Sequence, residues 1–460
     1  MKLFKKLLRI VLFLLVVALA YGVWFAWRAF PVISGYGAKI MASAVYLQHR
    51  NPDDVIKKEL SFYPVSIGTF TIHPEDSSVT GSVLGFAKRK AIYRTGLGCT
   101  LVIELSESEI RNQHFNLPVI PPQNSDTIAW PYGDKTTDSL PANIDNKALQ
   151  LAIGSAMQMP SKKGGPAYTR AFLVVYDGKI VGEQYASGFD KNSIHLGWSM
   201  TKSLTSAVIG VLVKAGKLNP DAPAPVPEWQ PTNKEKIKLK DILQQSSGLD
   251  YTENYNSPSE ATTMLFRRAN MGAYVASLPL KNEPGTLFYY SSGNANLLSR
   301  IIRQTVGDSV YPAFPYNALF HKINMFSLVL EPDASGTYVG SSYSYASARD
   351  FARFGLLYYN NGVWKGEQLL PENWVKETTQ PAPANKQNRY GYQFWLNGED
   401  ENAPGKRKYP DAPADMFFAD GTGGQNVFII PSKKLIVVRL GVLRVDENKY
   451  LREVIAAIKN

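Results

Sequence analysis

The sequence predicts a mixed α/β fold of the α+β type. One antiparallel sheet is built from both ends of a large unit, helices flank it, an all-helical domain is inserted between its halves, and a transmembrane helix precedes it. Three observations support this: two strand-like runs near residues 171–185, a mainly helical stretch over 219–380, and strand-like runs that return after 390. A sheet whose strands come from both ends of a unit, with helices between them in the sequence, is typical of a domain in which helices and sheet pack as layers.

The N-terminus reads as a membrane anchor. Residues 10–27 are eighteen positions without a charge, closed by Arg28 and preceded by lysines and an arginine. At 1.5 Å per residue this run nearly spans a bilayer core of ~30 Å. The basic flank predicts a cytoplasmic N-terminus, a single pass through the cell (inner) membrane and an extracytoplasmic, periplasmic main unit. A cleaved signal peptide is the alternative, since Ala18-Leu19-Ala20 has the small-x-small form, but the apolar run continues to Trp27 and favours an uncleaved anchor.

Composition divides the rest of the chain. Asn51-Pro52 begins a short helical pattern, and β-rich runs follow at 66–73 and 100–105. Five prolines among polar residues then mark an extended connector. We therefore expect a cytoplasmic stub and anchor at 1–34, a small accessory α/β region at 35–115, a Pro-rich connector at 116–142 and the main unit at 143–460.

Charge and cysteine content exclude several classes of protein. The net charge is +11, but five of the positive charges lie in the first thirty residues and the others form no basic stripe, so no nucleic-acid partner is expected. Cys99 is the only cysteine, which excludes an internal disulfide. The five histidines are dispersed without metal-ligand spacing. We expect no metal and no cofactor, and the sequence leaves the oligomeric state unknown.

The main unit follows a regular order. A helix is expected over 144–157, then a β-hairpin whose turn is Asp177-Gly178, then a helix that begins at Ser199 and ends before Gly216. The remaining patterns predict helices at 239–245, 259–277, 294–306, 347–359 and 447–458, and strands at 392–396, 416–419, 427–430 and 435–440.

Ser199 and Lys202 form the first candidate site. They are three residues apart in Trp198-Ser199-Met200-Thr201-Lys202-Ser203, so both lie on one face of the first helical turn. The unpaired N–H groups at that end carry partial positive charge. Ser199 is therefore a candidate nucleophile. The alternative is a purely structural N-cap, because serine is preferred there.

Two later segments offer partners. Tyr290 follows Pro284-Gly285-Thr286 just before a helix, where its phenol could carry a proton if cations such as Lys202 lowered its pKa; the alternative is simple aromatic packing. Residues 417–425 contain Asp420-Gly421-Thr422-Gly423, a glycine-rich strand edge that lets a substrate approach the backbone. The alternative there is an ordinary hairpin turn.

Together these segments resemble the serine β-lactamase and penicillin-binding-protein superfamily. The resemblance is strongest to class C β-lactamase-like hydrolases, the branch of family VIII esterases and 6-aminohexanoate-dimer hydrolases. Ser199-Met200-Thr201-Lys202 matches the family's Ser-x-x-Lys, Tyr290-Ser291-Ser292 its tyrosine motif, and Asp420-Gly421-Thr422-Gly423 the place of Lys-Thr-Gly. Residues 243–249, 284–286 and 347–355 also look like family segments in the right order.

The resemblance implies acyl transfer. Ser199 would attack a carbonyl, Lys202 and Tyr290 would move its proton, and the N–H of Ser199 with one from Gly421 to Gly424 would hold the oxyanion. Ser292 replaces the asparagine that holds the substrate amide in β-lactamases. Asp420 replaces the cation that binds the penicillin carboxylate, so it would repel that carboxylate and would suit an amine.

We therefore expect a membrane-anchored serine hydrolase that cleaves an amide or ester bond of a small substrate. The alternatives are a D-alanyl peptidase or β-lactamase, and a covalent sensor that is acylated without turnover. Ser292, Asp420, Gly421, Thr422 and Gly423 are the expected substrate-binding and oxyanion residues.

Overall fold

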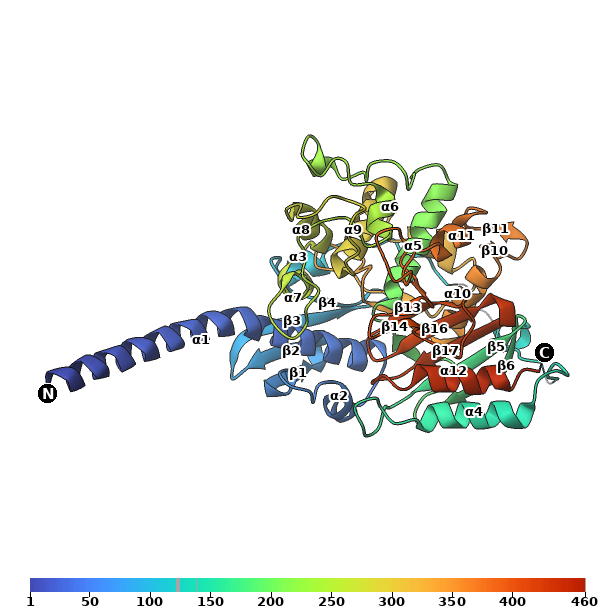
Figure 1. Ribbon diagram of the computed structural model, residues 1–460, viewed down its shortest axis with the longest axis horizontal. Coiled ribbons are helices and arrows are strands. Elements are labelled where there is room, and N and C mark those ends of the chain that lie inside the picture. The colour runs from blue at the N-terminus through green and yellow to red at the C-terminus, as the bar shows by residue number, and fades with distance from the viewer. Residues whose placement is uncertain (121–124, 138, 460) are drawn as a thin grey trace. The chain divides into compact units, whose positions relative to one another are not determined.

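The computed structural model (Figure 1) describes residues 1–120, 125–137 and 139–459 and resolves into two compact units. Unit 1 comprises Met1–Arg111 and Thr252–Ala269, and unit 2 comprises Asn112–Tyr251 and Asn270–Asn460. A short segment from the middle of the expected main unit thus belongs to the N-terminal one. Of the connector's prolines, Pro121 and Pro122 lie outside the described residues.

Unit 1 begins with a single long helix, α1 (Lys2–Ala42), which a π-helical turn extends to Leu47. Its first part is exposed: Leu12 and Phe13 are 60% and 65% exposed. From Ile33 onward most of its residues are buried. The exposed part is long and apolar enough to cross a membrane, a property that signal sequences share.

The buried part of α1 packs on a four-stranded antiparallel sheet, ordered β1-β2-β3-β4. Close approach requires glycine at Gly37, since a Cβ there would lie 1.9 Å from the Phe70 ring. The strands are β1 (Gly68–His73), β2 (Ser78–Val83), β3 (Phe86–Arg94) and β4 (Gly98–Leu101). Short helices α2 (Pro52–Glu59) and α3 (Glu107–Arg111) accompany them, and Asn51 caps α2 through the Asp53 N–H.

Helix α7 (Glu260–Arg267) completes unit 1 from far along the chain. Its Phe266 meets the Tyr36 ring edge-on at 5.9 Å between centroids. Behind it, Glu104 accepts hydrogen bonds from the Arg268 side chain and the Ala269 N–H, both at 2.7 Å. These contacts attach the returning segment to the N-terminal sheet.

Unit 2 is built on a six-stranded antiparallel sheet, ordered β12-β15-β16-β17-β5-β6. The early hairpin therefore pairs with the last strand, as the sequence predicts: Val174 of β5 lies opposite Val437 of β17. The strands are β5 (Ala171–Tyr176), β6 (Lys179–Tyr185), β12 (Trp395–Leu396), β15 (Phe417–Gly421), β16 (Gln425–Ile430) and β17 (Leu435–Leu440).

Helices cover both faces of this sheet. On one face, α4 (Asn146–Gln158) and α12 (Glu447–Ala456) enclose an apolar core that includes Phe172, Phe428 and Val437. On the other, α10 (Ala348–Tyr359) packs closely on β16 and β17, and a Cβ at Gly355 would lie 3.0 Å from side-chain atoms of both Ile436 and Val427. Helix α5 (Met200–Lys214) contacts β15 and β16 on the way to the helical part of the unit.

The helical part contains α5 and α9 (Ser292–Val306), which pack together, with α8 (Met271–Ser277) against α9. A small sheet, β7-β9-β8, lies next to the start of α5. The other elements of this unit are α6 (Leu239–Leu243), α11 (Trp374–Thr379), β7 (Ile194–Leu196), β8 (Val329–Leu330), β9 (Ser344–Ser347), β10 (Val363–Trp364), β11 (Glu367–Gln368), β13 (Glu399–Asp400) and β14 (Ala403–Arg407).

Three expected elements differ from the structure. The strand expected over 100–105 is β4, which ends at Leu101, and Glu104 beyond it has φ +56°. The helix expected over 259–277 is two helices, because Arg268 is extended and Asn270 begins a new helix by accepting the Ala273 N–H at 2.9 Å. The strand expected over 392–396 is only Trp395–Leu396, because Gln393 has φ +57° and interrupts the extended backbone.

Candidate active site

Ser199 lies at the junction of β7 and α5. The preceding residue, Trp198, has φ +48°, a conformation that a bulky side chain rarely adopts, and it turns the chain sharply into the helix. Ser199 occupies the N-cap position, yet its side chain accepts no hydrogen bond from a backbone N–H of the helix. Its Oγ lies instead 3.0 Å from Lys202 Nζ. The hydroxyl is thus not used as a structural cap.

Lys202 is buried, 1% exposed, one turn into α5. Its Nζ lies 3.0 Å from each of three oxygens: Ser199 Oγ, Ser292 Oγ and the Ser341 carbonyl. An ammonium donates to all three. A neutral amine keeps two of these bonds as a donor and turns its lone pair toward the third oxygen. The geometry therefore suits an exchange of one proton with Ser199.

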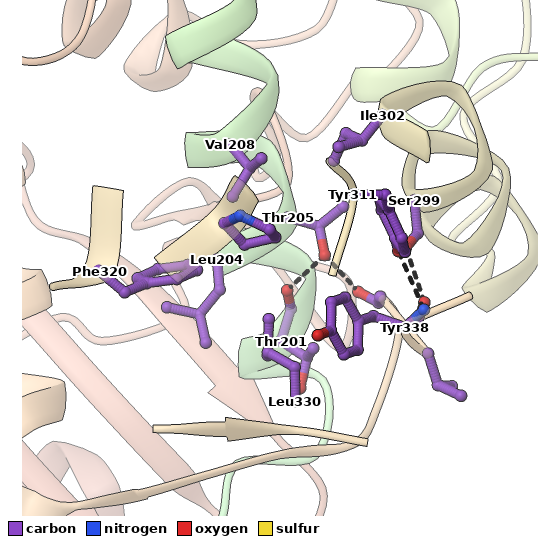
Figure 2. A pocket seen from close by; sticks show the side chains of 13 residues that line it. Thr201, Leu204, Thr205, Val208, Ser299, Ile302, Tyr311, Phe320, Leu330 and Tyr338 are labelled. Carbon is purple, nitrogen blue, oxygen red and sulfur yellow. Dashed lines mark hydrogen bonds between the residues drawn. The ribbon is translucent and has the colours of Figure 1, made fainter. Parts of the chain in front are cut away.

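The segment carrying Ser341 is fixed from two sides. Asn296 of α9 donates to Ser341 Oγ at 3.1 Å and accepts from the Ser341 N–H at 3.2 Å. Thr205 of α5 donates to the Gly340 carbonyl at 2.9 Å. Thr205 also lines a small pocket of about 20 Å³ whose walls are mainly apolar side chains, several of which are labelled in Figure 2. Because this is room for about one water, α5 is closely supported there.

Tyr290 lies next to Lys202 through its ring. Lys202 Nζ is 4.9 Å from the ring centroid, within cation–π range. The same ring stacks on Trp395 of β12 at 5.2 Å and meets Tyr390 edge-on at 5.9 Å. The three predicted residues Ser199, Lys202 and Tyr290 are thus brought together, with the Tyr290 ring as the contact to the amine.

Gln245, for which the sequence predicted no role, fixes the backbone of the segment that carries Tyr290. Its carbonyl accepts from the Tyr289 N–H at 2.8 Å, and its Oε1 accepts from the Ser291 N–H at 3.1 Å, so the backbone is fixed on both sides of Tyr290. Its Nε2 donates to Gln393 Oε1 at 3.1 Å. Gln245 has a left-handed φ of +61°, which directs its carbonyl and its side-chain amide toward these partners. The residue pattern of 243–249 does not predict that conformation.

The glycine-rich end of β15 lies directly against the turn that precedes Ser199. A Cβ at Gly421 would lie 2.2 Å from the Gly197 carbonyl and 3.2 Å from the Trp198 Cβ, so only glycine fits. Within the described part of the chain, neither the Ser199 N–H nor the Thr422 N–H donates to another group. These two N–H groups are available to a ligand. Gly423 follows with φ +80°, which turns the chain back into β16.

Asp420 does not present a free negative charge. Arg444 Nη2 lies 2.9 Å from both of its carboxylate oxygens, and Asn426 donates to Oδ1 at 2.7 Å. Asp420 was expected to repel a carboxylate or to suit an amine, and in the structure Arg444 balances its charge. Its observed contacts orient Arg444 beside the strand end.

Sequence reasoning missed one cation near Trp395, Lys408. Lys408 Nζ is 5.7 Å from the Trp395 ring centroid and 5.7 Å from that of Tyr409. Among the described residues no carboxylate lies within salt-bridge distance of it. Burial lowers the pKa of Lys408 below the usual lysine value. Lys408 is thus a half-buried cation next to the residue on which Tyr290 stacks.

This fold and a serine hydroxyl next to a buried lysine define a serine hydrolase of the β-lactamase-like class. Residues 167–455 match the Beta-lactamase family, which is more than half of the chain. The protein belongs to that family.

Individual relatives agree with this assignment. The chain is 25% identical over 302 residues to the 6-aminohexanoate-dimer hydrolase of Paenarthrobacter ureafaciens, covering 59% of this chain and 72% of that protein. A family VIII carboxylesterase structure aligns with TM-score 0.51 and 15% identity, over 70% of this chain and 98% of that one. A penicillin-binding-protein homologue from Caulobacter crescentus gives TM-score 0.51 and 15% identity, over 69% and 97%. The two structural matches establish the fold.

Proposed function

We propose that the protein hydrolyses an amide or ester bond of a small substrate through an acyl-enzyme on Ser199. The observation that carries this proposal is the position of Lys202 Nζ, 3.0 Å from the Ser199 hydroxyl in a buried site. A hydroxyl at its ordinary pKa is a weak nucleophile, and an adjacent amine base activates it. The relation to 6-aminohexanoate-dimer hydrolase and to esterases supports the choice of bond.

The mechanism follows from the contacts. Lys202, neutral before reaction, accepts the Ser199 proton while Ser199 Oγ bonds to the substrate carbonyl carbon. Ser292 Oγ and the Ser341 carbonyl continue to accept from Nζ, and the Tyr290 ring face stabilises the ammonium that forms. The N–H groups of Ser199 and Thr422 stabilise the oxyanion, with Gly421 and Gly423 shaping the turn. Lys202 returns the proton to the leaving group, and water then releases the acyl group.

A mass measurement tests this proposal. The chain is mixed with p-nitrophenyl esters, short amides and a penicillin, quenched, and weighed intact. We expect a transient acyl adduct that Ser199→Ala abolishes together with turnover, and that the exposed, remote Ser187→Ala retains. An active Ser199→Ala protein overturns the assignment. A stable stoichiometric adduct indicates a sensor, and faster cleavage of penicillin or D-Ala-D-Ala than of the esters and amides indicates the peptidase or β-lactamase alternative.

We also propose that residues 10–27 anchor the protein, uncleaved, with unit 2 outside the cytoplasm. The exposed apolar part of α1 and its basic flank support this placement. The test is the mature N-terminus of the membrane-extracted protein, together with protease digestion of spheroplasts before and after lysis. We expect a chain that begins at Met1 and is digested from outside. A soluble chain that begins after Ala20 overturns the anchor.

A further inference from the structure

The turn between β2 and β3 has an unusual composition. Leu84 and Gly85 have φ +51° and +79° between the paired residues Val83 and Phe86. Such a two-residue turn favours Asn, Asp or Gly at its first position. Two other turns of this protein have the same signs of φ and place polar residues there: Asp177-Gly178 and Lys365-Gly366.

Leu84 is unfavourable at this position in two ways. A branched apolar side chain at positive φ is strained, and the side chain is 74% exposed. Phe86, which ends the turn, is 69% exposed, and Ile67, which precedes the partner strand β1, is 41% exposed. Ile67, Leu84 and Phe86 lie at the same end of the adjacent strands β1, β2 and β3, and such a group of exposed apolar side chains points to a contact outside the chain.

Contacts within unit 1 place this turn at one end of the sheet. The Tyr46 hydroxyl, near the end of the helical segment, donates to the Ser78 carbonyl at 3.3 Å, at the start of β2. Gly81, three residues later, lies against Ser34: a Cβ there would be 2.2 Å from the Ser34 carbonyl. Strand β2 therefore runs back along α1 toward its exposed apolar part.

The position of the turn along the axis of α1 follows from the lengths of the strand and helix segments. Three residues of strand cover about 10 Å, and about 10 Å of helix separates Ser34 from Trp27. Leu84 therefore lies at about the level of Trp27, near the end of the exposed apolar part of α1. Trp24, with Arg28 stacked over its ring at 5.1 Å, marks the same level. Tryptophan and arginine are typical of a membrane–water boundary.

The charges near the turn are positive. Lys88 is exposed, Arg89 follows it, and the pKa of Arg89 is lowered by burial and by the nearby Arg267. Among the described residues none of these three cations has a carboxylate within salt-bridge distance. Anionic headgroups would balance them.

We propose that the β2–β3 turn, residues 83–89, rests in the headgroup layer of the membrane that α1 spans, with Leu84 and Phe86 in the acyl boundary and Lys88 and Arg89 on anionic lipid. This rests on the proposed anchor. Because α1 continues as one helix from the apolar part into the core of unit 1, the turn gives that unit a second attachment and fixes its orientation toward the bilayer.

Site-directed spin labelling of the full chain tests the proposal. The buried Cys99 is replaced by alanine, and single cysteines at 16, 75, 84 and 86 are labelled in vesicles of equimolar phosphatidylcholine and phosphatidylglycerol. We expect labels at 84 and 86 to favour oxygen over a water-soluble nickel complex, as the label at 16 does. Glu75, in the turn at the opposite end of β2, is the water-exposed control.

The outcomes separate the two proposals. A label at 16 in water overturns the anchor itself. A label at 16 in lipid with 84 and 86 as water-exposed as 75 overturns only the inference about the turn. In vesicles of phosphatidylcholine alone, the labels at 84 and 86 should remain in contact with lipid but lie closer to water. If their depth is the same as in the mixed vesicles, Lys88 and Arg89 do not bind anionic lipid.

A second variant excludes misfolding. Leu84→Asn suits the turn better than leucine and should leave the thermal unfolding temperature equal or higher. In the same variant, a label at 86 should move toward water. If Leu84→Asn leaves the depth of the label at 86 unchanged, Leu84 does not contact the membrane.

Discussion

At the scale of single residues, the surroundings of Lys202 combine three oxygens and one aromatic face. Two of the oxygens accept hydrogen bonds from either protonation state, whereas the third bond from Nζ and the contact with the Tyr290 ring face require the ammonium. The surroundings of Lys202 therefore stabilise the ammonium that the first proton transfer produces. Ser199, freed from capping α5, supplies the proton.

The contribution of Tyr290 is divided between its ring and its hydroxyl, and two substitutions separate them. Tyr290→Phe keeps the ring over Lys202 and on Trp395, so we expect a loss in kcat/KM of about tenfold or less. Tyr290→Leu removes the ring and should cost considerably more. Steady-state kinetics on a p-nitrophenyl ester measure both. If Phe is as damaging as Leu, the hydroxyl itself carries the proton.

Lys408 should influence the charge of the preferred substrate. Its half-buried ammonium lies by Trp395 without a carboxylate partner among the residues described. We expect Lys408→Met to raise KM about tenfold for an ester with a carboxylate on its acyl chain, the effect of losing one charge-assisted contact, and to leave its neutral isostere unchanged. Lys408→Arg is the matched control.

The same residue predicts a pH dependence. Because burial lowers the pKa of Lys408, its positive charge is lost at lower pH than that of an ordinary lysine. The preference for the anionic ester over the neutral one should therefore fall as pH rises into the alkaline range, and Lys408→Arg should keep it. A preference that is independent of pH in the unsubstituted protein contradicts this role.

Asp333 gives a separate prediction for stability. Burial raises its pKa to about 6, against hydrogen bonds from the Met271 and Thr337 N–H groups and Ser335. A carboxyl with a raised pKa in the folded state stabilises below the unfolded pKa of about 4 and loses that contribution as pH rises through about 6. The free energy of unfolding should fall by up to roughly 3 kcal/mol over this interval.

Urea unfolding at a series of pH values measures this effect. Asp333→Asn should flatten the slope between about pH 4 and 6, at a cost of about 1 kcal/mol because an amide nitrogen cannot accept from the Met271 N–H. An unchanged slope in the variant assigns the pH dependence to another group.

At the scale of elements, the end of β15 and the turn before α5 are fitted to each other. Gly421→Ala places a methyl group 2.2 Å from the Gly197 carbonyl, so one of the two backbones must shift. We expect a loss in kcat on the order of a hundredfold, the effect of misplacing one oxyanion donor, with a retained circular dichroism spectrum. Gly154→Ala in α4 is the control, since nothing lies within 4 Å of that position.

The element patterns were predictable where periodicity is strong and local. The hairpin at Asp177-Gly178, the helix after Ser199 and the last three strands agree with the structure. The break at Arg268 and the left-handed Gln393 were not predictable, because each depends on contacts with distant segments. The side chain of Gln393, for example, donates to the Leu243 carbonyl at 2.8 Å.

The candidate site shows the same division. Sequence spacing placed Ser199 and Lys202 on one helical turn, and the order of motifs added Tyr290. The pairing of Asp420 with Arg444 was not predicted, because the two residues lie 24 positions apart. Gln245 and Lys408 were missed because backbone angle and packing, not residue type, give them their positions.

At the scale of the whole molecule, the chain leaves unit 1 at Arg111 and returns to it at Thr252. Helix α7 supplies Phe266 against Tyr36, and Arg268 and the Ala269 N–H bind Glu104. The N-terminal unit is therefore not a module that can be exchanged by cutting the chain once. A fragment that ends at Arg111 should unfold more readily than unit 1 does in the full chain, measured by limited proteolysis, whereas equal resistance would show that α7 is dispensable.

This interleaving sets an order of events on the ribosome. After α1 and its sheet emerge, residues 112–251 must be synthesised before the closing helix appears, a delay of about 7 to 30 s at typical elongation rates. During that interval the surface of unit 1 that α7 later covers is exposed. A chaperone or the translocation machinery has a defined window in which to hold it.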